Sequence, residues 1–189
     1  MLTRPTACLL LTACLIGEIR SEEPRVVECT IGERSVKLSL TGSAVRSKHF
    51  LKIYAIDSYI EEGAKIRSAE DMIASDQAKQ LRIMMLKTVD GPTMAEAFTE
   101  IFRANYPEPA FADELDKVLK ILESETAKKG DTIWFSHVPK AGFHCKTSND
   151  KTYLIRNVEF SKAVWGNYFG KHNAGETVKK ELLGKLPKE

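Results

Sequence analysis

Arg46 is a charged residue at a position where the sequence pattern predicts a buried side chain. It has the same parity as a run of apolar and small residues, namely Val36, Leu38, Leu40, Gly42 and Ala44. If one unbroken strand contains this run, the Arg46 guanidinium emerges from the buried face of that strand. A buried guanidinium is costly when it is unpaired, so this position is a candidate for contact with a ligand.

Two asparagines place an amide on the apolar stripe of a predicted helix. Asn105 follows Phe98 by seven residues and Asn167 follows Phe160 by seven, which is about two helical turns in each case. Tyr54 adds a phenol from a strand next to that of the arginine. A few polar groups that point inward among apolar side chains are the usual design of a small-molecule site. We therefore expect these side chains to converge on one pocket.

Each of these side chains also has an ordinary structural interpretation. An inward asparagine or tyrosine, taken singly, is more often a core group with satisfied hydrogen bonds than a ligand contact. Arg46 is also compatible with a turn just after the end of its strand. The two interpretations differ in whether the polar groups meet in space.

The elements that would position these residues follow from the period of the apolar residues and from the turn residues between them. Period two predicts strands over residues 26–31, 35–45, 50–60, 81–88, 132–138, 142–147 and 152–156. Helical spacing predicts helices over residues 69–74, 93–106, 159–169 and 176–183. It also predicts a helix with an apolar stripe over residues 111–122 and a lysine-rich end before Gly130. Residues 50–60 are apolar on both parities, so this strand should be covered on both faces. Strands around a helical middle are typical of an α+β domain with a largely antiparallel sheet.

The composition favours one globular domain. A chain of 189 residues with 43% hydrophobic residues can bury a substantial core. The 28 Lys and Arg residues nearly balance the 26 Asp and Glu residues, and they are scattered along the chain. Binding to a phosphate backbone requires a continuous positive face, which this distribution does not predict. Nucleic acid is therefore not an expected partner.

The first residues have the features of an export signal. Arg4 supplies the positive flank, and residues 7–17 form an apolar run that is too short to span a bilayer. We expect a signal peptide over residues 1–22, cleaved between residues 18 and 23, and a single domain over residues 23–189. The protein would be exported, either periplasmic or secreted, with no membrane span. The alternative is a lipoprotein signal that ends at Cys14, but hydrophobicity continues through Leu15 and Ile16.

Metal, cofactor and nucleophile chemistry have little support in the sequence. Cys29 and Cys145 would remain in the mature chain, where an oxidising compartment permits a disulfide that the sequence does not decide. His137 and His144 lie on different predicted strands without a patterned acidic partner, so no metal site is expected. The sequence contains no Ser/His/Asp nucleophile motif, phosphate-binding glycine loop or dinucleotide fingerprint, and we expect no cofactor.

Residues 42–60, with the sequence GSAVRSKHFLKIYAIDSYI, resemble the signature of the chalcone isomerase-like family. In that family a G-x-x-x-R-x-K-F segment runs into a K-V-Y-A-x-x-L-Y strand. The resemblance continues in order through residues 87–90, 98–105, 130–134 and 138–142, and it closes with Phe160, Trp165, residues 169–171 and residues 182–184. The family implies an open-faced β-sandwich, in which a layer of helices covers a large antiparallel sheet. It also implies a site in the cleft between these layers.

The resemblance also implies roles for individual residues. In plant members that act on chalcones, an arginine on the early strand polarises the substrate ketone while a phenolate closes the ring, a step that needs mainly orientation and charge stabilisation. Arg46 matches that arginine, and Asn105 matches an asparagine of the family's site. Phe98 stands where those enzymes have a tyrosine, and Tyr54 and Asn167 stand where they have threonines. Chalcone cyclisation in the plant manner is therefore not the expected activity.

The combination of Arg46 with Tyr54 resembles instead the fatty-acid-binding branch of the family. There these two groups would hold a carboxylate through charge-assisted hydrogen bonds. Apolar side chains would take the hydrocarbon, and the candidates for these walls are Phe98, Phe102, Met84 and Leu86.

Three functions are compatible with this resemblance. The first is a non-catalytic carrier or sensor for a small amphipathic carboxylate such as a fatty acid, with ligand contacts at Arg46, Tyr54, Phe98, Asn105 and Asn167. The second is an isomerase of the intramolecular-lyase type that acts on a chalcone-like enone. In that case Arg46 is the electrophile, with Asn105 and Asn167 as orienting groups. The third is an interaction module whose cleft is filled by its own side chains.

Overall fold

The structure of the protein is a computed structural model, and it describes residues 25–31 and 34–186. The expected signal peptide, with its two cysteines, lies outside the described residues, as does the expected turn at Gly32 and Glu33. Within the described part of the chain, no helix is both long enough and apolar enough to cross a membrane.

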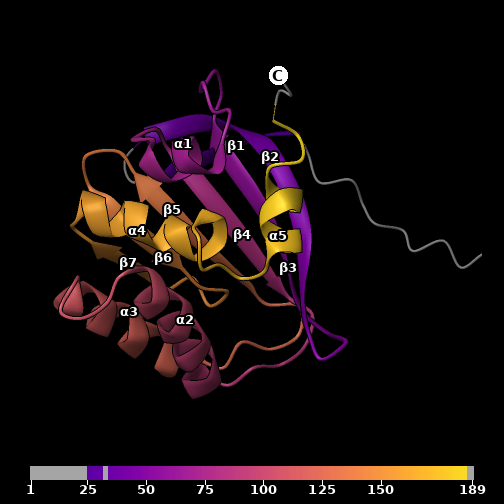
Figure 1. Ribbon diagram of the computed structural model, residues 1–189, viewed down its shortest axis with the longest axis vertical. Coiled ribbons are helices and arrows are strands. Elements are labelled where there is room, and N and C mark those ends of the chain that lie inside the picture. Colours follow the sequence, from indigo (N-terminus) through magenta and orange to yellow (C-terminus); the bar gives the residue numbers. More distant parts are fainter. Residues whose placement is uncertain (1–24, 32–33, 187–189) are drawn as a thin grey trace, which may run out of the picture.

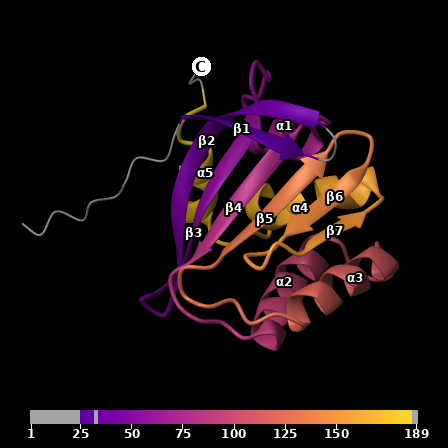
Figure 2. The same cartoon turned by 180° about the vertical axis from the view of Figure 1, so that it is seen from behind.

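Seven antiparallel strands form one sheet, and strands that follow each other in the sequence are neighbours in space. Each connection is therefore a hairpin or a longer excursion that returns to the adjacent position (Figure 2). The strands are β1 (Val26–Ile31), β2 (Arg34–Lys48), β3 (Leu51–Glu61), β4 (Lys79–Met85), β5 (Thr132–Val138), β6 (Gly142–Lys146) and β7 (Thr152–Ile155). The predicted antiparallel sheet is confirmed, whereas the order of the strands in space is a finding of the structure.

In the described part of the chain five helices lie over one face of the sheet and along its lower edge (Figure 1), which confirms the expected α+β architecture with a helical layer over an antiparallel sheet. They are α1 (Ala69–Ala74), α2 (Gly91–Asn105), α3 (Ala112–Glu123), α4 (Val158–Phe169) and α5 (Glu176–Leu182). Side-chain caps fix where α1, α2 and α4 begin. Asp90 accepts a hydrogen bond from the backbone N–H of Thr93, and Asn157 accepts one from Phe160. These caps satisfy amide groups that the first turn of a helix leaves unpaired.

Strand β2 contains a bulge, so its side chains change face along its length. The register with β3 shifts between Leu40 and Gly42. Before the shift, Leu40 packs in a second core on the outer side of the sheet, whose other members are Ile31, Val36, Leu38, Tyr59, Ala78 and Val138. After it, Ala44 packs in the main core under the helices. The predicted unbroken parity from Val36 to Arg46 is therefore wrong, because a bulge adds one residue to the strand.

The bulge also anchors α5 on the sheet. The Thr41 hydroxyl donates to the backbone carbonyl of Leu182 over 2.9 Å. At Gly42 a Cβ atom would lie 2.1 Å from the carbonyl oxygen of Glu181, so only glycine allows the helix backbone to approach this closely. The C-terminal end of α5 is thus fixed against β2, and the connection before α5 is brought over the later part of that strand.

Strand β3 is covered on both faces only in its second half. Residues 56–60 are all buried, as the apolar pattern on both parities predicts. At its beginning, however, Leu51 is 60% exposed, and Phe50 in the preceding turn is fully exposed at 103%. The prediction of two-sided cover is therefore wrong for the β2–β3 hairpin, which projects beyond the helical layer (Figure 1).

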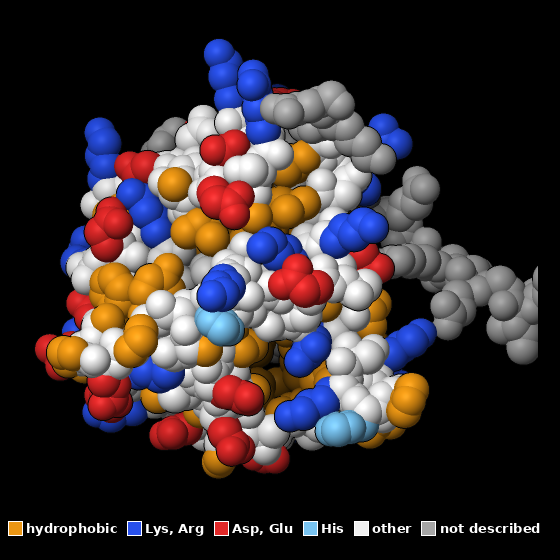
Figure 3. Space-filling view, viewed as in Figure 1, with side chains coloured by type: hydrophobic (Ala, Val, Ile, Leu, Met, Phe, Trp, Pro, Cys, Tyr) orange, Lys and Arg blue, Asp and Glu red, His pale blue; other side chains and the backbone are white. Residues whose placement is uncertain are grey.

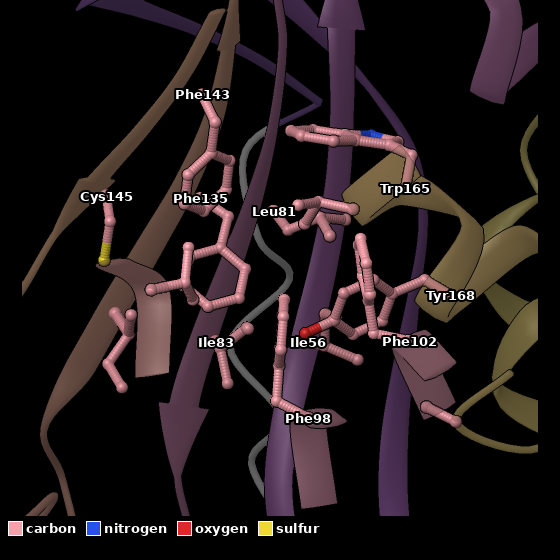
Figure 4. Packing of buried hydrophobic residues seen from close by; sticks show 14 of the residues in the cluster. Ile56, Leu81, Ile83, Phe98, Phe102, Phe135, Phe143, Cys145, Trp165 and Tyr168 are labelled. Atoms are coloured by element: carbon pink, nitrogen blue, oxygen red, sulfur yellow. The ribbon is translucent and has the colours of Figure 1, made fainter. Parts of the chain in front are cut away.

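The main core lies between the sheet and the helices, and aromatic rings from α2 and α4 meet rings from β5 and β6 in it (Figure 4). Phe102 of α2 is fully buried, with ring centroids 5.6 Å from Phe160 of α4 and 6.0 Å from Phe98 of its own helix. Cys145 belongs to this core, whereas Cys29 packs in the second core on the other side of the sheet. Both thiols are free, so the disulfide that the sequence left open does not form here.

Candidate functional site

Arg46 and Tyr54 face each other across β2 and β3 where the apolar inner face of the sheet ends. The preceding rung on this face consists of buried Ala44, Ile56 and Ile83. The next rung consists of Arg46, Tyr54 and Met85. Directly opposed residues of antiparallel strands carry their side chains on the same face and close together. The two polar groups therefore stand side by side at the end of an apolar surface.

The Arg46 guanidinium lies beneath the connection between α4 and α5. A Cβ atom at Gly175 would come within 3.0 Å of Arg46 Nη1, and Gly175 has a φ of 130° that favours glycine. The side chain is partly buried. Among the residues that the structure describes, no carboxylate forms an ion pair with Arg46. Its inward direction agrees with the sequence prediction, although the bulge and not a continuous alternation produces it.

Two tyrosine hydroxyls accompany the guanidinium. Burial raises the pKa of Tyr54 to about 12, although the positive charge of Arg46 lowers it. Burial also raises the pKa of Tyr168 well above its ordinary value, and the neighbouring Tyr54 and Cys145 raise it further. Figure 4 shows the Tyr168 hydroxyl directed from α4 toward the sheet. Both phenols are therefore protonated at neutral pH and can donate a hydrogen bond.

Sequence reasoning missed Tyr168. In α4 every residue from Phe160 to Phe169 except Lys162 is buried, so the helix has almost no polar face against which an inward tyrosine would stand out. The only signal was its place next to Asn167, which the family resemblance had already selected.

Phe98 lies in the main apolar core, and its predicted contact with a ligand stays a prediction. Its side chain is buried, and its ring meets Phe135 of β5 edge to face with centroids 6.2 Å apart. Two other predicted wall residues are wrong. Met84 pairs with Ala55 and so points to the opposite face from Met85, which is the residue that packs in the main core. Leu86 has the parity of Met84. The predicted strand overlaps β4, but its side chains were assigned to the opposite faces of the sheet.

Asn105 binds backbone and links α2 to the α4–α5 connection. Its Nδ2 donates to the carbonyl oxygens of His172 at 2.6 Å and Ile101 at 3.1 Å. Its Oδ1 accepts from the backbone N–H of His172 at 3.2 Å. The amide thus holds the connection that passes over Arg46. These contacts fit a positioning role, and direct contact of Asn105 with a ligand stays a prediction.

Asn167 is buried at the contact between α4 and α2. Its Nδ2 lies 3.4 Å from the carbonyl oxygen of Phe98, and its Oδ1 is buried with no hydrogen-bond partner among the described residues. A buried carbonyl oxygen without a donor costs roughly 1–3 kcal/mol. Asn167 therefore reaches the same wall as Phe98, while its predicted contact with a ligand is untested.

The surface is hollowed at the end of the sheet where the β2–β3 hairpin lies (Figure 3). In Figure 3 a depression lies between α2 and the β2–β3 hairpin, with hydrophobic side chains in its depth and Lys or Arg side chains at its edge. A small apolar recess with a positive rim and buried hydroxyls can hold the polar end of an amphipathic anion and the start of its hydrocarbon.

A second polar cluster, on the far side of α4, was not expected. His137 Nδ1 lies 2.9 Å from Ser161 Oγ, and His137 Nε2 lies 3.1 Å from Asp76 Oδ1. The order Ser–His–Asp resembles a nucleophile triad, but Ser161 and His137 are fully buried and no substrate can reach the hydroxyl. The sequence could not reveal this cluster, because its members are 24 and 61 residues apart.

Lys79 completes this buried cluster. Its ammonium donates to three carbonyl oxygens at the end of α1, those of Met72 (2.6 Å), Ser75 (2.8 Å) and Ile73 (3.0 Å). Burial lowers the pKa of Lys79 to about 7, and the positive charge of Lys162 adds to this effect. The cluster joins α1, β5 and α4, so we assign it to stability. No group of His, Cys, Asp and Glu side chains in the described ranges could hold a metal ion.

Comparison with known proteins agrees with this architecture. Residues 27–184 match the model of the family described as chalcone isomerase-like. The chain belongs to the chalcone isomerase-like family. A curated relative, a chalcone–flavanone isomerase from Clitoria ternatea, is 26% identical over 123 residues, which are 61% of this chain and 56% of that protein. The match therefore spans little more than half the length of that enzyme.

A solved structure has the same fold at low sequence identity. The crystal structure of a fatty-acid binding protein from Arabidopsis thaliana superposes with a TM-score of 0.61 and 12% identity. The match covers 77% of this chain and 86% of that one. This likeness confirms the predicted family fold, a curled antiparallel sheet covered by helices.

Proposed function

We propose that this member of the chalcone isomerase-like family binds a small amphipathic carboxylate, such as a fatty acid, in the cleft between sheet and helices without chemical turnover. The observation that carries the proposal is the rung of Arg46 and Tyr54 at the end of the apolar inner face. A carboxylate there would receive charge-assisted hydrogen bonds from the guanidinium and a hydrogen bond from the Tyr54 phenol. The hydrocarbon would follow the apolar surface toward Phe98.

Several features support binding over catalysis. Phe98 offers no hydroxyl to a substrate ketone, and the Asn105 amide is already engaged with backbone atoms of Ile101 and His172. The hollow favours a ligand over a cleft filled by its own side chains. The likeness to a fatty-acid binding protein concerns the fold, and it makes fatty acids a reasonable first class of ligand to test.

The decisive test is a titration with a fluorescent fatty acid, 11-(dansylamino)undecanoic acid. Arg46→Ala should weaken binding at least tenfold, because a hydrogen bond to a charged group contributes about 1.5–3 kcal/mol. Tyr54→Phe should weaken binding less, since it removes one neutral donor. The methyl ester of the same fatty acid should compete poorly, because it lacks the carboxylate charge.

Arg156→Ala is the matched control, because Arg156 is exposed between β7 and α4 and its loss changes the net charge equally. This variant should bind as the wild type does. Melting temperatures of all variants should be compared, so that unfolding is not mistaken for a lost contact. Unchanged affinity in a folded Arg46→Ala protein would remove the proposal.

A second candidate is an isomerase acting on a chalcone-like enone, and the curated plant relative favours it. Arg46 would stabilise the developing enolate oxygen, and Asn105 would orient the site. The test is the loss of naringenin chalcone absorbance in the presence of purified protein. A rate above that of buffer which disappears in Arg46→Ala would support catalysis. A rate equal to that of buffer would contradict the isomerase function and leave binding without turnover as the remaining proposal.

A further inference from the structure

The tip of the β2–β3 hairpin exposes apolar side chains in a strained turn. Lys48 pairs with Leu51, so His49 and Phe50 form a two-residue turn. Their φ angles are 49° and 66°, in the left-handed region. Turns of this kind favour Asn-Gly, because a side chain in the left-handed region clashes with the backbone. Phe50 is fully exposed and Leu51 is 60% exposed. The fold therefore tolerates an unfavourable conformation that holds a phenyl ring in water.

Positive charge surrounds this apolar tip. From Ser47 to Ile56 the sequence contains two Lys residues and one His but no Asp or Glu. The next connection adds exposed Lys87, because the backbone N–H of neighbouring Leu86 donates to the carbonyl of Ile53. The loop with exposed Lys128 and Lys129 adjoins Thr88, whose hydroxyl accepts from the Lys129 N–H at 3.3 Å. The acidic residues of these two loops, Asp90 and Asp131, accept backbone hydrogen bonds from Thr93 and Lys128. The lysines therefore make the surroundings of the apolar tip mainly basic.

Figure 3 shows how this tip lies relative to the hollow. The hairpin, at the lower right, carries hydrophobic, Lys or Arg, and His side chains, and it borders the depression. Some acidic side chains lie across the hollow, on the side of α2, and others lie above it, over α5 and the upper part of this face. The mouth of the candidate site and the apolar tip therefore open at the same end of the molecule.

We propose that the β2–β3 hairpin docks on an anionic phospholipid surface, with Phe50 and Leu51 inserted among the lipids. Lysines next to a membrane-inserted aromatic ring are attracted by anionic headgroups. A protein partner is a poorer match, since stable protein interfaces cover about 800 Å² per partner and this tip offers two protruding apolar side chains. If the proposed fatty-acid function holds, docking would place the mouth of the cleft against the source or the destination of its ligand.

Vesicle binding tests the proposal with the protein as cells produce it. Mass spectrometry should first verify that the wild type and all variants begin at the same residue, because the apolar segment over residues 7–17 would itself bind lipid. The wild type should sediment with vesicles of equal parts phosphatidylglycerol and phosphatidylcholine at low salt. It should bind pure phosphatidylcholine at least tenfold more weakly, because each lysine near an anionic surface strengthens binding roughly fivefold.

Three variants isolate the tip. Phe50→Ser combined with Leu51→Ser should lower vesicle binding at least tenfold, and Lys48→Glu should lower it by a similar factor and reduce its dependence on salt. Leu154→Ser is the control for loss of an exposed apolar side chain, since Leu154 is 42% exposed on β7. Lys117→Glu is the control for charge, because Lys117 is exposed on α3. Both controls should bind vesicles as the wild type does.

The outcomes separate this inference from the proposed function. The double serine variant should still bind the fluorescent fatty acid in solution, whereas Arg46→Ala should still bind vesicles. Loss of fatty-acid binding alone would contradict the proposed function and leave docking intact. Equal vesicle binding by the wild type and the double variant would overturn docking. Docking would also be overturned if the wild type ignored anionic vesicles and the double variant instead abolished self-association in sedimentation velocity.

Discussion

Phe50 shows how one residue can be unfavourable for the fold and still be informative. A non-glycine residue in the left-handed region costs roughly 1–2 kcal/mol, and a bulky one is seldom found there. Phe50 recovers none of this through packing, because its ring is fully exposed. This conformational cost therefore occurs at a position where almost any small polar residue would be more favourable for the turn. Such a residue is more easily explained by what it contacts outside the chain than by the stability of the chain.

Phe50→Gly should accordingly stabilise the protein. Glycine adopts a φ of 66° without a steric penalty, although it also gains freedom in the unfolded chain, so the net gain should be about 1 kcal/mol. Urea denaturation should show a higher midpoint with an unchanged slope. The matched control is Leu51→Ala, which removes exposed apolar surface at the same tip without changing a strained φ. A lower midpoint for Phe50→Gly would mean that the turn is not strained.

Arg46 and Asn105 illustrate two different residue roles that look alike in the sequence. Both are polar residues at positions where apolar neighbours predict burial. The Asn105 amide forms hydrogen bonds with backbone groups of Ile101 and His172, so it holds the α4–α5 connection in place. Arg46 lies under that same connection, beside Gly175. Loss of Asn105 should therefore act on Arg46 through the connection, whereas loss of Arg46 acts on the ligand directly.

At the scale of elements, periodicity predicted the strands and helices well, because each is long enough for its pattern to repeat. Residues 26–31, 69–74 and 132–138 were predicted with the bounds that the structure has. The other elements differ by a few residues at their ends, where caps and turns decide. The order of the strands in space was not predicted, because periodicity defines elements and not their neighbours, and the connection from β4 to β5 contains two helices.

What periodicity could not predict is the effect of one extra residue. The bulge near Thr41 moves the side chains of β2 from the outer core to the inner core, and no single residue type in the sequence announces it. The Arg46 side chain was assigned to the correct face for the wrong reason. Met84 was placed in the cleft although Met85 points there. A shift of one residue in a strand reverses every side chain, so site residues on strands are the least certain part of such a prediction.

Contacts between residues that are far apart in the sequence could not be predicted either. Tyr168 joins Tyr54 from the other layer, and the buried cluster of Lys79, His137, Asp76 and Ser161 joins three elements. In each case the residues are ordinary in their local context. These residues come together because α4 packs across the sheet, and this packing is known only from the three-dimensional structure.

For the whole molecule, the buried cluster makes stability depend on pH. Burial lowers the pKa of His137 to about 4, the positive charge of Lys79 lowers it further, and the hydrogen bond to Asp76 opposes this. The same imidazole in the unfolded chain has a pKa near 6.5. Above pH 6.5 the His137 imidazole is neutral in both the folded and the unfolded chain, so it does not make stability depend on pH. Between pH 6.5 and 4, His137 is protonated in the unfolded chain but stays neutral in the folded chain. The free energy of unfolding therefore decreases as the pH falls.

This difference amounts to roughly 3 kcal/mol between pH 6.5 and 4, because each pKa unit corresponds to about 1.4 kcal/mol. His137→Gln keeps a neutral donor for Asp76 but cannot take up the proton. The variant should be less stable than the wild type at pH 7.5, because the glutamine packs less well against Trp165, yet it should lose less stability on acidification. Urea midpoints measured from pH 7.5 to 4.5 would reveal this as converging curves. The exposed His172→Gln variant should run parallel to the wild type, and parallel curves for His137→Gln would show that the buried imidazole does not govern the acid response.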